Sequence, residues 1–358
     1  MKLFECQHCG QLLYFENTTC VRCGHRLGYL PDDAMLSALE PDGDEWRPLF
    51  ALERRLKFCE NAQHDLCNWM VPEGSEETLC KACRHNRTVP DLSVPENLDR
   101  WRKIEAAKHR LFYTLIALKL PLDNLDDDPD HGLAFDFLSD KPTGPAQAKP
   151  PQVLTGHDQG LITLNIAEAD DVHREKTRHE MGEPYRTLLG HFRHEVGHHY
   201  WDILVAANPV ALEKCREVFG DEREDYGEAL KRHYAEGAPA DWQENYVSSY
   251  ATTHPWEDFA ETWTHYLHIV DTLETARAFG LKIEPRVSNL EPELTTDMQV
   301  RPTRAKDVQE LIDAWLPLTF AVNSLNRSMG QPDLYPFILS PAVIDKLAFI
   351  HDLVHRKF

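Results

Sequence analysis

The sequence predicts an α+β fold in which small cysteine-rich elements precede a mainly helical domain with a small antiparallel sheet. Eight of the nine cysteines fall within the first 83 residues. Apolar residues recur at helical spacing over much of the chain after residue 95, and the two runs flanking residues 157–160 alternate as in a β-hairpin. We expect a cysteine element at 1–28, a connector with a second cysteine element at 29–95, and a main domain at 96–358.

The composition limits the classes of partner. The 358 residues exceed the usual size of one domain. Lys and Arg number 38 against 59 Asp and Glu, and the net charge of −21 repels nucleic acid and anionic membranes. No apolar run reaches the length of a membrane span, and residues 1–6 lack the apolar core of a signal peptide. We therefore expect a cytoplasmic protein whose charge suits a peptide partner, with no membrane partner and with nucleic acid disfavoured.

The first cysteine set has the spacing of a metal site. Two Cys-x-x-Cys pairs, each followed by glycine, are ten residues apart: Cys6, Cys9, Cys20 and Cys23. Four thiolates can surround a zinc ion tetrahedrally, and the glycines allow the backbone to turn toward the metal. Two redox dithiols are the alternative, but they need a strand and helix pattern for which this segment has no room. We predict a structural zinc site because four protein ligands leave no position for water.

A second set of four cysteines follows within 25 residues: Cys59, Cys67, Cys80 and Cys83. Only the last pair is Cys-x-x-Cys, but so many cysteines in a short segment are hard to explain as core thiols. We predict a second structural zinc, with His64 as a substitute ligand if one cysteine is not used. Cys215 stands alone in the sequence and is expected to be a packing residue.

The main domain is expected to begin with a helix over 98–120. Residues 122–151 are acidic and rich in proline, and they indicate a loop with one strand at 133–137. A hairpin follows, with strands at 153–155 and 161–166. Its outer strand could pair with an extended substrate backbone or serve as an ordinary sheet strand, and the pattern leaves both possibilities open.

A His-Glu-x-x-His motif occupies His194, Glu195 and His198. Residues four apart on a helix lie one above the other, so the two imidazoles can bind one zinc ion, and Glu195 would be the general base. A helix is indicated by apolar residues three, four and seven positions apart, namely Tyr185, Leu188, Leu189, Phe192, Val196 and Ile203. The alternative is an ordinary helix with exposed histidines.

Further helices are expected at Pro209–Phe219, Asp225–Glu236, 305–320 and 342–354. The first two belong to a polar insertion, 208–245, in which nothing requires chemistry. A turn-rich connector over 325–336 is expected to separate the last two.

A helix starting at Pro255 carries Glu257 and Glu261 on one face, away from its apolar stripe. Zinc with two histidine ligands needs a third protein ligand to leave one position for water, and a glutamate from a second helix is one standard solution. A solvated helix face is the alternative reading of these two carboxylates.

These motifs resemble known families. The His-Glu-x-x-His motif with the later Glu257-x-Phe-Ala-Glu261 is similar to the gluzincin metallopeptidases, and residues 249–261 match the spacing of lethal-factor-type gluzincins. An N-terminal zinc ribbon joined to His254-Pro-Trp-Glu-Asp-Phe-Ala-Glu-Thr-Trp263 resembles a bacterial family of zinc-binding metallopeptidases, over nearly the whole chain.

The resemblance implies a zincin-type metallopeptidase domain with one catalytic zinc, beside two structural ones. Glu257 would be the third ligand and Glu261 a carboxylate that orients a ligand histidine, although spacing alone also allows the reverse. Tyr250 matches the tyrosine that stabilises the developing oxyanion, with Tyr246 in reserve. The implied reaction is peptide hydrolysis in which Glu195 assists a zinc-bound water. The distance from His198 to Glu257 is longer than in compact gluzincins, so the insertion could form a rim or lid.

Two other functions stay open. The first is a catalytically inactive adaptor that binds a protein partner through its zinc ribbons. The second is a nucleic-acid-linked protease of the Spartan type, which would need a basic surface such as the group Arg84, Arg87, Arg100, Arg102 and Lys103. In that type the third ligand is a histidine, whereas the best candidate here is a glutamate.

Overall fold

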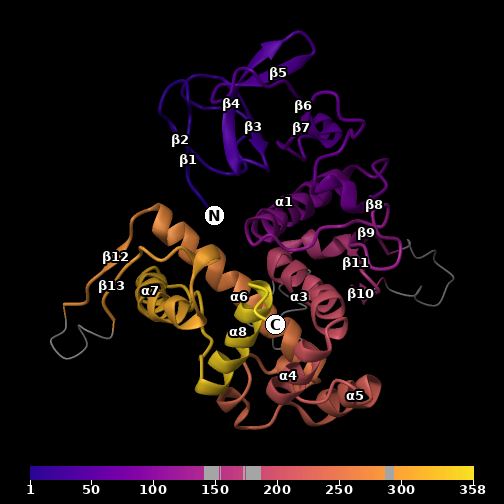
Figure 1. The fold of residues 1–358 in the computed structure, drawn as a ribbon, viewed down its shortest axis with the longest axis vertical. Coiled ribbons are helices and arrows are strands. Elements are labelled where there is room, and N and C mark those ends of the chain that lie inside the picture. The colour runs from indigo at the N-terminus through magenta and orange to yellow at the C-terminus, as the bar shows by residue number, and fades with distance from the viewer. Residues whose placement is uncertain (141–152, 154, 172–173, 175–186, 287–293) are drawn as a thin grey trace. The chain divides into compact units, whose positions relative to one another are not determined.

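The computed structural model describes residues 1–140, 153, 155–171, 174, 187–286 and 294–358 (Figure 1). Its described residues divide into two compact units: unit 1 comprises those from Met1 to Arg174 and from Thr187 to Phe192, and unit 2 those from Arg193 to Phe358. Helices and several small sheets make up the described ranges, so the predicted α+β class is confirmed. The expected proline-rich loop over 141–151, Leu154 of the hairpin and Tyr185 of the apolar stripe lie outside the described residues.

The N-terminal part of unit 1 contains two antiparallel sheets. The small one pairs β1 (Phe4–Glu5) with β2 (Leu12–Leu13). The other has five strands in sequence order, β3 (Arg26–Leu30), β4 (Met35–Asp42), β5 (Glu45–Pro48), β6 (Leu56–Phe58) and β7 (Met70–Pro72). Its core is formed by Leu30, Leu39, Leu56 and Met70. The boundary expected at residue 28 lies inside β3, and the segment expected to be a connector supplies β4 and β5.

A third sheet of unit 1 has the strand order β10-β11-β9-β8. Its strands are β8 (Asn86–Thr88), β9 (Ala134–Leu138), β10 (Gly156–Asp158) and β11 (Leu161–Asn165). The hairpin β10–β11 is antiparallel, as expected, but its first strand is Gly156–Asp158 and not the expected 153–155. It turns through Gln159 and Gly160, both at positive φ. The pairs β8–β9 and β9–β11 are parallel, so the sheet is mixed rather than purely antiparallel. The long connection that carries helix α1 (Pro95–Ala117) permits the parallel β8–β9 pair.

Helix α3 (Leu188–Tyr200) continues into a π-helical turn, Trp201–Ala206. The α-helices that follow, all in unit 2, are α4 (Pro209–Phe219), α5 (Tyr226–Glu236), α6 (Pro255–Ala278), α7 (Val308–Ser328) and α8 (Pro341–Val354). Strands β12 (Lys282–Ile283) and β13 (Thr296–Asp297) form a short antiparallel pair. Helix α7 extends beyond its expected end, so the expected connector over 325–336 is helical as far as Ser328.

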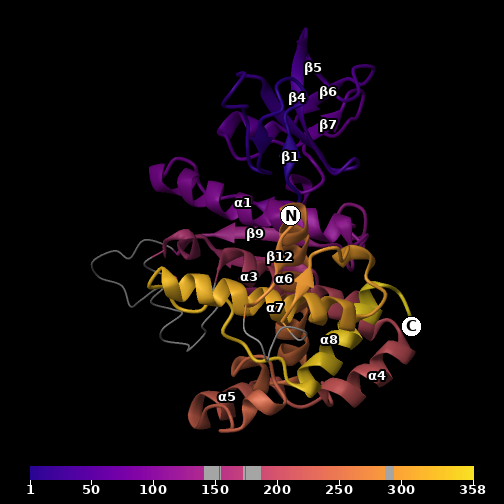
Figure 2. The ribbon, with the colours of Figure 1, turned by 90° about the vertical axis from the view of Figure 1, so that its left-hand side faces the viewer.

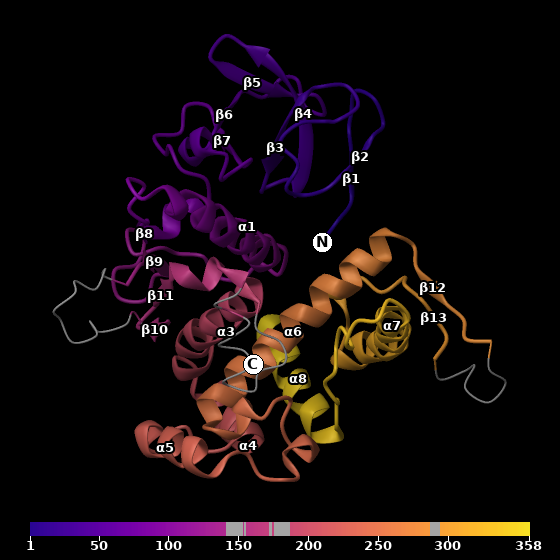
Figure 3. The ribbon, with the colours of Figure 1, turned by 180° about the vertical axis from the view of Figure 1, so that it is seen from behind.

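Helix α6 is the centre of unit 2. It contacts α4, α7 and α8 (Figures 1 and 3). Its apolar stripe, which includes Phe259, Trp263 and Leu267, is fully buried. Helices α4 and α8 lie side by side (Figure 2). None of the helices in the described ranges combines the length and apolarity that a bilayer crossing requires.

Candidate metal centres

Helix α3 presents the two histidines of the motif on one face. His194 and His198 are one helical turn apart, and their ring centroids are separated by 5.0 Å. Phe192 and Val196 are fully buried, which fixes the rotation of the helix about its axis. The ring of His198 also packs on Trp256 of α6, with centroids 3.9 Å apart. The histidines are thus held at the buried side of a helix and not on an exposed face.

Helix α6 brings two carboxylates to the same imidazole. The helix starts at Pro255 and is capped by His254, whose Nδ1 accepts a hydrogen bond from the Trp256 amide, so Glu257 lies in the first turn. Oε2 of Glu257 lies 3.0 Å from Nε2 of His194 and 3.5 Å from Nε2 of His198. One turn later, Oε1 of Glu261 accepts a 2.8 Å hydrogen bond from Nδ1 of His194. The geometry therefore favours Glu257 for the ligand position and Glu261 for orienting the ring.

A glycine allows the two helices to approach this closely. A Cβ atom on Gly197 would lie 3.1 Å from Cα of Ala260 and 3.3 Å from Cδ1 of Trp263. Such contacts are tighter than a packed interior normally holds, so a side chain at position 197 would push α3 and α6 apart. Gly197 directly precedes His198, which means that the close approach occurs where the donor atoms meet.

The donor set fits a cation. Nδ1 of His194 donates to Glu261, so in the neutral state of the ring Nε2 presents a lone pair toward Oε2 of Glu257. Oε2 is buried and has no hydrogen bond of good geometry from any described residue. In that state two acceptors face each other across this gap, and either a proton or a metal ion between them removes their repulsion. The nitrogens of His194 and His198 and a carboxylate oxygen of Glu257 lie within 4.8 Å of one another, a donor set that suits zinc.

The pKa shifts at the site indicate the same preference for positive charge. Burial opposes protonation of His194, but the carboxylates of Glu257 and Glu261 raise the pKa of His194 well above its usual value. Burial acts against the charged form of Glu257 too, yet the nearby charges of His198 and His194 hold the pKa of Glu257 well below the usual range. The site thus stabilises ionised carboxylates in a buried place, which requires a cationic partner.

The predicted catalytic residues lie around these donors. Glu195 is buried, and its charge contributes to raising the pKa of Tyr226, after burial and the charge of Glu257. The ring of Tyr250 lies 6.0 Å from that of His194, in the short helix Tyr250–Thr252. Burial and the charge of Glu257 raise the pKa of Tyr250 far above its usual value, so its phenol stays protonated and can donate. The reserve candidate Tyr246 lies instead against the ammonium of Lys346, 4.2 Å from its ring centroid.

Sequence reasoning missed Tyr226. Its hydroxyl donates a 2.7 Å hydrogen bond to Oε1 of Glu257, the oxygen that does not face the histidines. Tyr226 is the first residue of α5, which begins after the capping side chain of Asp225. The sequence indicated nothing in the insertion 208–245 that requires chemistry, whereas the structure places Tyr226 of this insertion against a predicted metal ligand. Only the capping pattern was visible in the sequence, and it indicates where the helix begins but not what its first side chain contacts.

A serine ties the carboxylate of Glu261 to the segment that carries Tyr250. Oγ of Ser248 donates to Oε2 of Glu261 at 2.6 Å and accepts a 3.1 Å hydrogen bond from the amide of Ala251. The two oxygens of Glu261 are thereby both engaged, one by His194 and one by Ser248. This arrangement resembles the outer partners that usually fix a metal-bound imidazole.

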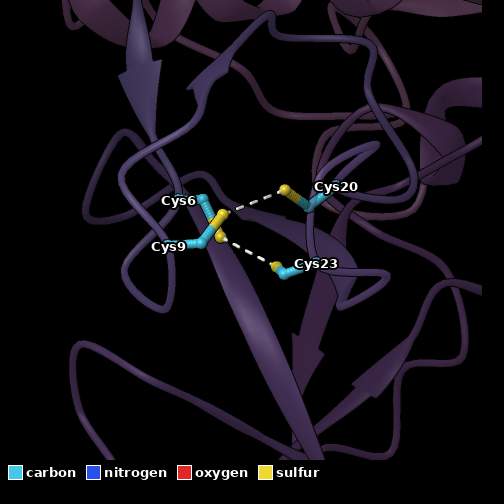
Figure 4. A group of neighbouring side chains, drawn as sticks. All are labelled: Cys6, Cys9, Cys20 and Cys23. Carbon is cyan, nitrogen blue, oxygen red and sulfur yellow. Dashed lines mark hydrogen bonds between the residues drawn. The ribbon is translucent and has the colours of Figure 1, made fainter.

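The first cysteine set is assembled by two loops. The side chains of Cys6, Cys9, Cys20 and Cys23 point toward one another, and their sulfurs lie within 4.8 Å of each other (Figure 4). Sγ of Cys6 is 3.6 Å from Sγ of Cys23, and the same distance separates the sulfurs of Cys9 and Cys20. All nine cysteines of the chain are free, so disulfides do not account for the cluster. Four converging thiols suit a closed tetrahedral zinc.

The second cysteine set is buried more deeply. The sulfurs of Cys59, Cys67, Cys80 and Cys83 also lie within 4.8 Å of one another, and all four residues are buried. Burial raises the pKa of the Cys67 and Cys80 thiols well above the usual value, so their thiolates need a cation beside them. His64, the expected substitute ligand, is in none of the possible metal groups of the described residues. His109 of α1 lies against the sulfurs instead.

Comparison with known proteins agrees with this geometry. A family model described as "Putative zinc-binding metallo-peptidase" matches residues 97–353. The chain belongs to this family. A "zinc-ribbon domain" model matches residues 3–94, which include both cysteine sets of this metallopeptidase family member. The predicted family is thereby confirmed.

Relatives of this chain occur in mycobacteria. The chain is 44% identical over 355 residues to "Uncharacterized protein Rv2568c" of Mycobacterium tuberculosis (strain ATCC 25618 / H37Rv), with 99% of this chain and 95% of the relative covered. The same figures hold for "Uncharacterized protein Mb2598c" of Mycobacterium bovis. No solved structure matches the chain.

Proposed function

We propose that this chain is a zinc-dependent peptidase that holds its catalytic metal through His194, His198 and Glu257. The observation that carries the proposal is the position of Oε2 of Glu257, 3.0 Å from His194 Nε2 and 3.5 Å from His198 Nε2. Two histidines and one glutamate are a standard ligand set of catalytic zinc, which leaves a coordination position open. When bound, zinc supplies Lewis acidity, which lowers the pKa of a bound water toward neutrality and polarises a carbonyl.

The residues around the donors have separate roles in this proposal. Glu195 accepts the proton of the attacking water and later delivers it to the leaving amine nitrogen. Tyr250 donates a hydrogen bond to the oxyanion that develops on the carbonyl oxygen, which its protonated phenol permits. Glu261 and Ser248 hold the ring of His194, and Tyr226 holds the carboxylate of Glu257. The substrate in this proposal is a peptide or an unfolded protein segment.

The contacts of the basic group weaken the nucleic-acid alternative. Arg84 pairs with Asp127, Arg87 with Asp136, Arg100 with Asp170 and Arg102 with Asp99. The Lys103 ammonium donates to the backbone carbonyl of Ala169. A surface whose arginines are neutralised within the chain offers little positive field to phosphates, and the net charge of −21 adds repulsion. The complete donor set, in turn, supports a peptidase over an inactive adaptor, because a decayed site would be expected to lose a ligand.

Replacement of the general base tests the proposal. Wild type, Glu195→Gln and the control Glu236→Gln, at the exposed end of α5, are loaded with zinc and incubated with fluorescein-labelled casein. We expect Glu195→Gln to keep its zinc and to cleave at least about 100-fold more slowly, whereas the control matches wild type. Cleavage by Glu195→Gln at the wild-type rate, with zinc retained, would overturn the mechanism. Wild-type protein that holds zinc but cleaves neither casein nor a fluorogenic peptide library would favour the adaptor.

A further inference from the structure

The second cysteine centre has a donor that comes from outside the cysteine segment. Nε2 of His109 lies 3.2 Å from Sγ of Cys67, 3.6 Å from Sγ of Cys83 and 3.9 Å from Sγ of Cys80. His109 is in the middle of α1, is 4% exposed, and follows Cys83 by 26 positions. All of these residues belong to unit 1.

The orientation of the His109 ring is fixed. Nδ1 donates a 2.7 Å hydrogen bond to the backbone carbonyl of Glu105, and a carbonyl oxygen only accepts, so Nδ1 carries the proton. Trp69, fully buried, packs against the ring with centroids 5.2 Å apart. The Glu105 side chain is held in turn by Trp101 and Lys108, each at 3.0 Å. The ring therefore has one nitrogen left, and that nitrogen faces the sulfurs.

The contacts of Nε2 suit a cation. In the neutral ring with its proton on Nδ1, Nε2 presents a lone pair toward three sulfurs, and either a thiol proton or a metal ion can lie between them. Zinc accepts both thiolate sulfur and imidazole nitrogen, and three cysteines with one histidine are a standard structural set. The imidazole nitrogen and the sulfurs of Cys67, Cys80 and Cys83 make four such donors, and Cys59 is a fifth. A tetrahedral zinc uses four of the five.

We propose that His109 is a metal donor of the second centre, so that loss of Cys59 leaves a complete set formed by His109, Cys67, Cys80 and Cys83. The four cysteines lie within the zinc-ribbon match, 3–94, whereas His109 lies within the metallopeptidase match, 97–353. The metal thus joins two family segments that are adjacent in the sequence: it ties the ribbon to the first helix of the metallopeptidase segment. This role is independent of peptide hydrolysis.

Metal content of full-length variants tests the donor role. Cys59→Ser, the double variant Cys59→Ser/His109→Ala, and the control Cys59→Ser/His85→Ala are compared after zinc loading and desalting. His85 is a suitable control because it is also a buried histidine of unit 1, and its Nδ1 bonds the Leu133 carbonyl at 2.8 Å. We expect Cys59→Ser and the control to hold equal amounts of zinc, and the His109 double variant to hold one zinc per chain less. Equal zinc in all three variants would overturn the proposal, as would loss of the second zinc in Cys59→Ser itself.

A single substitution keeps the test decisive if a double variant does not fold. His109→Ala retains all four cysteines, so it is compared with wild type for the rate at which a chelator removes zinc and for the absorption of the cobalt(II)-loaded protein. We expect one of the zinc-release phases to become faster and the sulfur-to-cobalt absorption to change. Release rates and cobalt spectra identical to those of wild type would show that His109 does not act on the metal.

Discussion

The hydroxyl of Tyr226 donates a 2.7 Å hydrogen bond to Oε1 of Glu257, 31 positions away along the chain. The other oxygen of the same carboxylate faces the histidines of α3. Tyr226 thereby engages the oxygen that faces away from the histidines, and it brings helix α5 into contact with the candidate site. The insertion that separates His198 from Glu257 therefore supplies a side chain that contacts the candidate site.

Removal of the Tyr226 hydroxyl should weaken zinc binding. In Tyr226→Phe the carboxylate of Glu257 loses its outer partner, and such losses typically reduce metal affinity by about 10- to 100-fold. Competition with a chromophoric chelator measures the affinity. Tyr234→Phe, on the same helix and 60% exposed, is the control and should bind zinc as wild type does. If the two variants bind zinc equally well, the hydrogen bond has no role in holding the metal.

Ser248→Ala should lower both stability and zinc affinity. The substitution removes the donor to Oε2 of Glu261 and the acceptor for the Ala251 amide. A buried group left without its partner costs about 1–3 kcal/mol. Thermal unfolding and chelator competition check the two effects. Ser249→Ala is the neighbouring control, since Ser249 accepts from Thr252 through its backbone carbonyl. A melting temperature of Ser248→Ala no lower than that of the control would contradict this account.

Gly197→Ala should destabilise the protein although alanine favours a helix. Alanine gains about 1 kcal/mol of helix propensity over glycine. Overpacking against the backbone of Ala260, 3.1 Å from the new Cβ, costs about 1–3 kcal/mol. We expect a net loss of about 1 kcal/mol and weaker zinc binding, measured by denaturant unfolding and chelator competition. In the control Gly227→Ala, in α5, the new Cβ makes only an ordinary contact with Asp225. This substitution should therefore leave the free energy of unfolding unchanged or raise it. A stabilised Gly197→Ala would show that α3 can shift without cost.

His265 should make the protein less stable in mild acid. Burial lowers the pKa of His265 to about 4, below the 6.5 of an exposed histidine. The unfolded chain therefore binds more protons between these values. The free energy of unfolding keeps its full value above the pKa that His265 has in the unfolded chain. It falls by up to about 3 kcal/mol as the pH drops toward the pKa that His265 has in the folded protein. Buried His85 and His351 act in the same direction.

His265→Gln separates this effect from the others. Glutamine has no charge to gain and can still hydrogen-bond the Tyr335 hydroxyl, which lies 2.7 Å from Nδ1 of His265. Denaturant unfolding at about pH 7.5 and about pH 5 should show a smaller loss of stability in the variant than in wild type. The same loss in both proteins would mean that His265 does not titrate in this range.

Local chemistry alone was enough to predict the motif helix and the first cysteine set. Residues four apart on any helix share a face, so His194 and His198 could be placed together before their surroundings were known. The helix starting at Pro255 was likewise predictable from its capping and its apolar stripe. The five-stranded sheet of β3–β7 was not, because its strands are short and their pairing depends on contacts that no local pattern encodes.

The tertiary structure decided the remaining questions, since they depend on how distant elements pack. Spacing placed Glu257 and Glu261 on one face of α6, but only the approach of α3 at Gly197 shows that Glu257 faces both histidines and Glu261 the far side of one ring. Tyr226 and His109 come from helices whose own sequences carry no metal motif. A ligand pair within one helical turn is a property of the local chain, whereas a partner from another helix is determined by packing.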